Sequence, residues 1–284
     1  MKLKIVSDLH LEFSYIDIPN NGVDVLVLSG DILVALYLKK PVSTVEGIPE
    51  ESNKVKFRKF LSTVSTNFKH VVYVAGNHEF YNGAWYNTID VLKNECSNYP
   101  NIHYLENESI EIDGVTFVGS TLWTDLNKKD PITTTVISSL LNDYRVIRND
   151  RYGYRRINPS DVTARFDASL QYITDTVNAN PSGKFVIVGH HAPSFQSIHP
   201  QYADNLHVSG AYSSSLDEFI LDHPQIQLWT CGHNHYAHQY YIGSTLVVCN
   251  PRGYDSTDKH GFHYGENTGW DINQIIDLES LPTL

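Results

Sequence analysis

The chain has 284 residues, of which 41% are hydrophobic and 19% charged, and this composition excludes an intrinsically disordered protein. Its formal net charge of −11 argues against stable binding to duplex nucleic acid or to an anionic membrane. The apolar run at residues 32–38 is too short to span a bilayer, and a carboxylate as early as Asp8 argues against a signal peptide. The cysteines Cys96, Cys231 and Cys249 show no paired spacing, so we predict free thiols in a reducing compartment. Together these features predict a soluble, cytoplasmic protein.

Short apolar runs rich in β-branched residues recur along the chain and predict the buried strands of an α/β protein. The clearest runs are residues 2–7, 24–29, 70–75, 184–188 and 226–230. Two hairpins are also predicted, one joining 109–112 to 115–119 through Asp113-Gly114, and one joining 240–242 to 245–248 through Gly243-Ser244.

Helical spacing of apolar residues appears between these runs. It predicts helices over residues 57–68, 84–96 and 162–177, each with one apolar face toward the core. Ser215 and Glu218 have the spacing of a capping box, which predicts another helix start.

Two long segments, residues 37–53 and 123–159, interrupt the alternation of strands and helices. Long irregular segments in a compact domain are commonly lids or binding loops. We therefore predict one domain spanning residues 1–284, with lid or insert loops at 37–53 and 123–159.

Five predicted strands are each followed by Asp, Asn or His at the carboxyl end, which is where open α/β sheets bind ligands. Asp-x-His and His-x-His place two side chains on one side of an extended strand end. Carboxylate oxygens, amide oxygens and imidazole nitrogens are ligands that Mn²⁺, Fe and Zn²⁺ accept. Seven such residues suit two metal ions that share a carboxylate better than they suit one ion. The seven are Asp8, His10, Asp31, Asn77, His190, His233 and His235.

In chain order these motifs are Asp-x-His at 8–10, Gly-Asp at 30–31, Gly-Asn-His-Glu at 76–79, Gly-His at 189–190 and Gly-His-x-His at 232–235. This series resembles the signature of the calcineurin-like metallophosphoesterase superfamily. The stretches SDLHLEF, VAGNHEF, LWTD, NDYR and CNPRGY, which begin at residues 7, 74, 122, 142 and 249, further resemble the small prokaryotic and phage phosphoesterases of that superfamily.

The resemblance implies an α/β fold of four layers, a β-sandwich of two mixed sheets flanked by helices, with the site on loops at one edge. It implies that two metal ions are held, and that a hydroxide bridging them attacks phosphorus. The roles it implies are first-metal ligands Asp8, His10 and His235, second-metal ligands Asn77, His190 and His233, bridging ligand Asp31, and catalytic histidine His78, which protonates the leaving group.

The motifs define the type of reaction more narrowly than they define the substrate. We expect a phosphodiesterase acting on a small, nucleotide-type substrate. A phosphomonoesterase or protein phosphatase is the alternative, a nuclease is disfavoured by the net charge of −11, and a non-catalytic scaffold of the same fold is disfavoured by the complete ligand set. Manganese is the expected metal, with iron and zinc as alternatives. Nothing in the sequence indicates the oligomeric state.

Three residues are further candidates for substrate contacts. His191 either contacts phosphate or packs beneath the site. Arg145 belongs to a cluster of five arginines within residues 145–156, for which salt bridges and phosphate recognition are both open. Arg252 follows the last metal motif by one hairpin and is expected near the site.

Two further sets of residues belong with these candidates. The salt-bridge alternative for the arginines names Asp143, Asp150 and Asp161 as partners. Trp123, Tyr144 and Tyr254 lie close to the motifs in sequence and are hypothesised to stack on a nucleotide base. Glu79 is interpreted as a residue that anchors its loop and not as a metal ligand.

Overall fold

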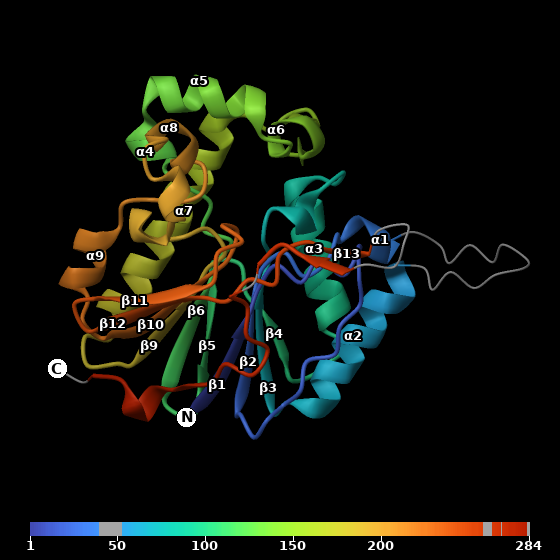
Figure 1. The fold of residues 1–284 in the computed structure, drawn as a ribbon, viewed down its shortest axis with the longest axis vertical. Helices are drawn as coiled ribbons and strands as arrows, with labels where there is room; N and C mark the ends of the chain where they lie inside the picture. Colours follow the sequence, from blue (N-terminus) through green and yellow to red (C-terminus); the bar gives the residue numbers. More distant parts are fainter. Residues whose placement is uncertain (40–52, 258–262, 268, 283–284) are drawn as a thin grey trace, which may run out of the picture.

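The computed structural model describes residues 1–39, 53–257, 263–267 and 269–282. Two large mixed sheets pack face to face, and helices cover the outer face of each (Figure 1). This arrangement confirms the expected four-layer α/β fold. Most of the predicted loop 37–53 falls outside the described residues.

The first sheet has five strands in the order β15-β1-β2-β3-β4, and all are parallel to their neighbours except β15. Its strands are β1 (Lys2–Val6), β2 (Val25–Ser29), β3 (His70–Val74), β4 (Ile102–Tyr104) and β15 (Ile276–Asp277). The three apolar runs predicted in the first part of the chain are therefore confirmed as neighbouring strands. Because they are parallel, their carboxyl ends lie at one edge of the sheet.

The second sheet has six strands in the order β11-β12-β10-β9-β6-β5, with antiparallel pairs at both edges and parallel pairs between them. Its strands are β5 (Glu108–Ile112), β6 (Val115–Gly119), β9 (Phe185–Val188), β10 (Ile226–Cys231), β11 (His238–Ile242) and β12 (Thr245–Cys249). Both predicted hairpins are present. Asp113 and Gly114 have φ values of 48° and 80°, as a two-residue hairpin turn requires.

Apolar side chains on alternate positions of the strands form the layer between the two sheets. Leu3 and Ile5 of β1 belong to this layer together with Val186 and Val188 of β9, whereas Val6 belongs to the core under the helices. Burial on both faces explains why these strands are almost entirely apolar in sequence.

The outer faces are covered by amphipathic helices. The first sheet packs against α2 (Asn53–Asn67) and α3 (Trp85–Cys96), and the second against α7 (Pro159–Asn178) and α9 (Asp217–Asp222). The helices predicted over 57–68, 84–96 and 162–177 are therefore confirmed. The capping box predicted at Ser215 is wrong, because α9 begins after Leu216 without a side-chain cap. A capping box does occur at α7, between Asn158 and Asp161.

The segment 123–159 is largely regular in the structure. It contains α4 (Leu126–Lys129, left-handed), α5 (Pro131–Leu140), α6 (Asp143–Val146) and the short pair β7 (Arg148–Asn149) and β8 (Arg155–Arg156). Figure 1 shows α4, α5 and α6, together with α8 (Leu206–Ser209), gathered beyond one end of the sheets. The smaller elements are α1 (Leu36–Lys39), β13 (Asp255–Thr257), β14 (His263–Gly265) and four 3₁₀ turns at His78–Phe80, Phe195–Ser197, Pro200–Tyr202 and Leu278–Ser280.

The cysteine prediction is wrong for two of the three residues. Cys231 and Cys249 stand opposite each other on the neighbouring strands β10 and β12 and form a disulfide. Cys96 is free and buried. Sequence spacing missed the pair because it depends on two non-consecutive strands becoming neighbours in the sheet. The inference of a reducing compartment loses its cysteine evidence. Within the described part of the chain, no helix has the length and apolar character needed to cross a membrane.

We expect Cys249→Ser to lower the free energy of unfolding by about 3 kcal/mol, because it reopens a loop that the disulfide closes across 18 residues. Urea denaturation measures the change, and dithiothreitol should lower the free energy of unfolding of the wild-type protein by a similar amount. An unchanged midpoint in both samples would show that the disulfide contributes nothing to stability.

Candidate metal centre

Loops from both sheets meet at one edge of the sandwich, and each carries side chains from one sequence motif. A parallel bridge between Ser7 and Pro251 joins the ends of the two sheets there. The sequence-predicted ligands come from the loops after β1 (Asp8 and His10), β2 (Asp31), β3 (Asn77), β9 (His190) and β10 (His233 and His235). The structure therefore brings together all seven residues from five separate strand ends.

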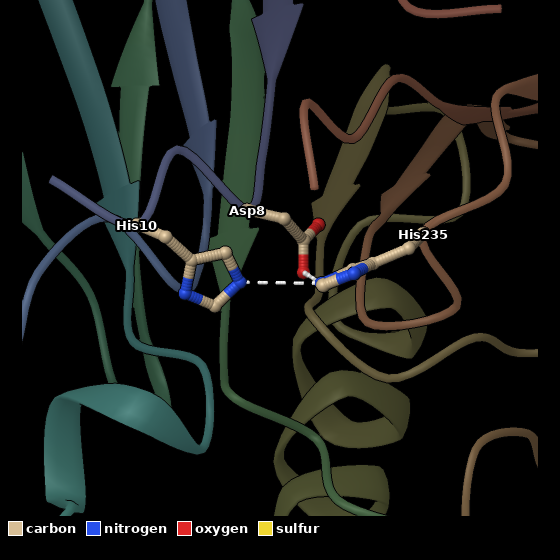
Figure 2. A group of neighbouring side chains, drawn as sticks. All are labelled: Asp8, His10 and His235. Atoms are coloured by element: carbon tan, nitrogen blue, oxygen red, sulfur yellow. Dashed lines mark hydrogen bonds and ion pairs between the residues drawn. The ribbon is translucent and has the colours of Figure 1, made fainter. Parts of the chain in front are cut away.

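The first group of converging side chains is Asp8, His10 and His235, whose ligand atoms lie within 4.8 Å of one another (Figure 2). Nε2 of His10 is 3.2 Å from Nε2 of His235, which is 3.3 Å from Oδ1 of Asp8. The other ring nitrogens face carboxylates, Glu12 for His10 at 3.3 Å and Glu266 for His235 at 2.5 Å. Because a carboxylate accepts hydrogen bonds, it holds the ring proton on Nδ1. Two imidazole lone pairs and a carboxylate oxygen are thus directed at one point, which suits a cation.

The second group contains Asp31, Asn77, His190 and His233. Nε2 of His190 lies 3.5 Å from Oδ2 of Asp31 and 3.2 Å from Oδ1 of Asn77. Nδ1 of His190 donates to the carbonyl oxygen of Ser29 at 2.9 Å, which leaves Nε2 free to bind a metal. Nε2 of His233 is buried and has no hydrogen-bond partner among the residues that the structure describes. These oxygen and nitrogen atoms are suitable ligands for a second metal ion.

Asp31 lies between the two groups. Its Oδ2 is 3.5 Å from Nε2 of His190 and 3.9 Å from Nε2 of His10. Its Oδ1 accepts a hydrogen bond from the backbone nitrogen of His78 at 2.8 Å, which fixes the plane of the carboxylate. This position is the one that a carboxylate shared by two ions requires.

In the absence of metal ions, the charged side chains of the site shift one another's pKa values. Burial alone would lower the pKa of His190, but the neighbouring Asp31 carboxylate outweighs it and raises that pKa to about 9. Burial would also lower the pKa of His235, but the hydrogen bonds that its ring donates to the carboxylates of Asp8 and Glu266 outweigh burial and raise that pKa to about 10. The pKa of Asp31 falls well below its usual value because His190 and His78 outweigh its burial. A metal ion that enters at neutral pH therefore displaces protons from these rings.

The backbone is left-handed at five of the seven predicted ligands. Non-glycine residues rarely adopt this conformation, which costs of order 1–3 kcal/mol each and occurs preferentially at functional sites. The five φ values are 50° at Asp8, 44° at His10, 54° at Asp31, 65° at His233 and 44° at His235.

The geometry of these loops also depends on Gly30, Gly76 and the buried Glu79. A Cβ at Gly30 would lie 2.4 Å from Nδ1 of His190, and one at Gly76 would lie 2.2 Å from Oδ1 of Asp31. Glu79 accepts hydrogen bonds from the backbone nitrogens of Asp31 and Gly76 at 3.0 and 2.7 Å. Glu79 therefore ties the loops after β2 and β3 together and does not face the metal-ligand groups.

His78 lies at the side of this centre. Its Nδ1 is 3.3 Å from Oε1 of Glu12, and its Nε2 is 3.2 Å from the hydroxyl of Tyr254. Its ring stacks on Tyr81, with centroids 4.1 Å apart. Burial would lower the pKa of His78, but Asp31 and Glu12 outweigh it and raise the pKa. The histidine is therefore fixed in orientation, and its protonated form is more stable than that of a free imidazole.

A cavity of about 430 Å³ opens beside the predicted ligands. Its lining includes Asp31, Asn77, His78, His233 and His235. The rest of the wall comes from the end of α5 through the start of α6, from residues between 198 and 212, and from Tyr254 and Glu266, which contact His78 and His235. The segment 123–159, predicted as a lid or insert, thus contributes part of this wall.

The three predicted substrate-contact residues do not line this cavity. Arg252 is buried and donates to the carbonyl oxygens of Leu9 and Ser14 at 3.2 Å each. The exposed Arg145 donates to the carbonyl oxygen of Ser139 at the end of α5. His191 is buried beneath the site, with its ring centroid 4.3 Å from that of His233. Burial, followed by the charge of the adjacent His190, lowers the pKa of His191 to about 3.

The base-stacking hypothesis fails for two of its three residues. Trp123 and Tyr144 are only 2% and 8% exposed, and neither lines the cavity. Trp123 instead stacks on His191, with ring centroids 5.1 Å apart. Tyr254 does line the cavity. The two buried rings were misleading because closeness to a motif in sequence does not indicate exposure.

Of the three predicted acidic partners of the arginine cluster, Asp161 forms the salt bridge, with Arg155 at 2.6 Å. Asp150 accepts hydrogen bonds from the backbone nitrogens of Tyr86 and Asn87. Asp143 lies in the site, where it contacts Asn77.

Glu266 is a residue that sequence reasoning missed. Its Oε2 lies 2.5 Å from Nδ1 of His235 and accepts a hydrogen bond from the backbone nitrogen of Tyr254 at 3.0 Å. It follows His235 by 31 residues, outside every motif, so no local pattern could indicate it. Glu12 lies within the stretch SDLHLEF, whose spacing does not indicate a role for it, and in the structure it contacts both His10 and His78.

We expect Glu266→Gln to weaken metal binding at the Asp8, His10 and His235 group by about 10–100-fold, because the ring of His235 loses the carboxylate that orients it. Calorimetric titration with Mn²⁺ measures this change. Glu111→Gln, at an exposed position on β5, makes the same chemical change away from the site and should bind as the wild type does. Equal affinity of both variants would contradict an orienting role.

Comparisons with known proteins agree with this geometry. The family model of calcineurin-like phosphoesterases matches residues 1–237. An uncharacterised protein of Acanthamoeba polyphaga mimivirus is 30% identical over 289 residues, which cover 92% of this chain and 94% of that protein. Among solved structures, phosphopantetheinyl hydrolase from Mycobacterium tuberculosis aligns with a TM-score of 0.61 and 15% identity over 89% of both chains. The structural match indicates a shared fold.

Proposed function

This chain belongs to the calcineurin-like phosphoesterase family, whose members are metal-dependent phosphoric ester hydrolases, and from this premise we propose that it is a dinuclear phosphodiesterase acting on a nucleotide-type substrate. The observation that carries the proposal is the convergence of two groups of metal-ligating atoms on the shared carboxylate of Asp31. Manganese is the proposed metal, since mixed carboxylate, amide and imidazole ligands suit it.

Two bound metal ions would activate a water molecule and neutralise charge that develops on the phosphate. The protein supplies the geometry around that chemistry. Glu12 and Tyr254 hold the two ring nitrogens of His78, so the ring can present a proton at Nε2 toward the cavity. We propose that this proton goes to the leaving oxygen as its bond to phosphorus breaks.

Nucleotide-type specificity is supported by the size of the cavity and by its aromatic lining. The volume of about 430 Å³ falls within the range of small-molecule sites. Tyr202, Tyr212 and Tyr254 contribute aromatic side chains to it, and aromatic rings are suitable surfaces for stacking a base.

The test is reconstitution of metal-stripped protein with Mn²⁺, followed by comparison of bis(p-nitrophenyl) phosphate with p-nitrophenyl phosphate. We expect faster hydrolysis of the diester and loss of turnover in Asp31→Asn. Assays of nucleotide diesters under the same conditions then show which nucleotide substrate is hydrolysed fastest.

Faster hydrolysis of the monoester would favour a phosphomonoesterase or protein phosphatase and would overturn the diester proposal. Turnover of neither substrate, with less than one metal ion bound per chain, would favour a non-catalytic scaffold.

A further inference from the structure

Asp143, the first residue of α6, is linked to the candidate metal centre through the side-chain amide of Asn77. It is 5% exposed, and its Oδ1 accepts hydrogen bonds from Nδ2 of Asn77 and from the hydroxyl of Tyr81, each at 2.9 Å. We propose that Asp143 is a positioning residue that directs the Asn77 amide oxygen toward the second metal ion, and that it thereby couples this metal site to the wall of the substrate cavity. The proposal goes beyond the proposed function and rests on its second metal site.

The chemistry of the amide gives the first reason. An asparagine side chain has one end that accepts hydrogen bonds and one that donates, and only the oxygen end is a suitable ligand for a divalent metal. An ionised carboxylate accepts and cannot donate, so Asp143 can bind only the NH₂ end of Asn77. With Nδ2 held by Asp143, Oδ1 faces Nε2 of His190 at 3.2 Å.

The position of Asp143 in the fold gives the second reason. Residues 140–143 line the substrate cavity, so the run that forms this wall also carries the carboxylate that holds Asn77. The hydrogen bond spans 66 residues of sequence and connects α6 to the loop after β3. Displacement of this wall would therefore release the amide and remove a ligand from the second metal.

Tyr81 provides a matched control. Its hydroxyl shares Oδ1 of Asp143 with Asn77, and its ring stacks on His78. Tyr81→Phe removes one donor to Asp143 and a long contact of 3.5 Å with Nδ2 of Asn77, but keeps the carboxylate and its 2.9 Å hydrogen bond with Asn77. If orientation of the amide is what matters, this variant should keep its second metal ion.

The first experiment titrates metal-free protein with Mn²⁺ by calorimetry and follows the paired-ion signal by electron paramagnetic resonance. In Asp143→Ala we expect the affinity for the second Mn²⁺ to fall about 10–100-fold while the first site is unchanged. Tyr81→Phe and wild-type protein should both bind two ions. Retention of both ions by Asp143→Ala would overturn the proposal. Loss of both ions would assign Asp143 to general folding and would equally overturn it.

The second experiment exchanges the amide at position 77 and the carboxylate at position 143. Asn77→Asp alone places two carboxylates face to face and should bind the second Mn²⁺ poorly. Adding Asp143→Asn restores a donor opposite the carboxylate, and the exchanged pair should recover binding by about tenfold or more relative to Asn77→Asp. No recovery would argue against pairing through this hydrogen bond. Wild-type protein that binds fewer than two ions would instead contradict the proposed dinuclear centre itself.

Discussion

Asp31→Asn is expected to reduce hydrolysis by at least about 10³-fold and to weaken both metal sites together. The two oxygens of Asp31 have separate tasks, since Oδ1 accepts from the His78 backbone and Oδ2 lies between the rings of His10 and His190. An amide retains only one oxygen, so one of these tasks is lost. The substitution also removes the negative charge that two cations would share.

Metal content and kcat/KM should be measured on the same preparation of this variant. Asp150→Asn makes the same change of carboxylate to amide at a residue that holds only the backbone of α3. It should retain both metal ions and full turnover. If Asp31→Asn kept two ions and wild-type turnover, Asp31 would not bridge them.

His78→Asn is expected to slow cleavage of esters with poor leaving groups by about 10²–10⁴-fold. The reason is that a basic leaving oxygen needs a proton, whereas p-nitrophenolate departs without one. Methyl phenyl phosphate and methyl p-nitrophenyl phosphate separate these cases, and the second should lose less than about tenfold. Both metals should remain, because His78 is not one of the seven predicted ligands and its ring nitrogens face Glu12 and Tyr254.

His103→Asn provides the comparison for this variant. His103 lies on β4 beside His70, and neither residue lines the cavity. Equal losses with both leaving groups in His78→Asn would indicate that His78 organises the site and does not donate the proton.

Much of the fold and of the ligand set could be predicted because both depend on local patterns. Buried strands are apolar throughout, and each predicted ligand follows such a strand within a few residues. Parallel strands then bring Asp8, Asp31 and Asn77 to one edge without further information.

The residues that orient the ligands were not predictable in the same way. Glu266 and Asp143 reach His235 and Asn77 across 31 and 66 residues of sequence, from segments with no metal motif. The disulfide between Cys231 and Cys249 likewise depends on β12 lying beside β10. The buried Arg252 shows the opposite error, because a charged residue after a metal motif suggested a substrate contact but is used to hold the backbone of the first loop.

The left-handed backbone at positions 8, 10, 31, 233 and 235 has a consequence for engineering this enzyme. A redesign that optimises thermal stability alone would favour glycine or asparagine at these five positions, since these residues adopt the conformation at lower cost. A change to glycine would remove a proposed metal ligand, and a change to asparagine would replace a carboxylate or an imidazole with a neutral amide. Stability screens performed on metal-free protein would therefore select against activity, and libraries for this fold should hold these five positions fixed.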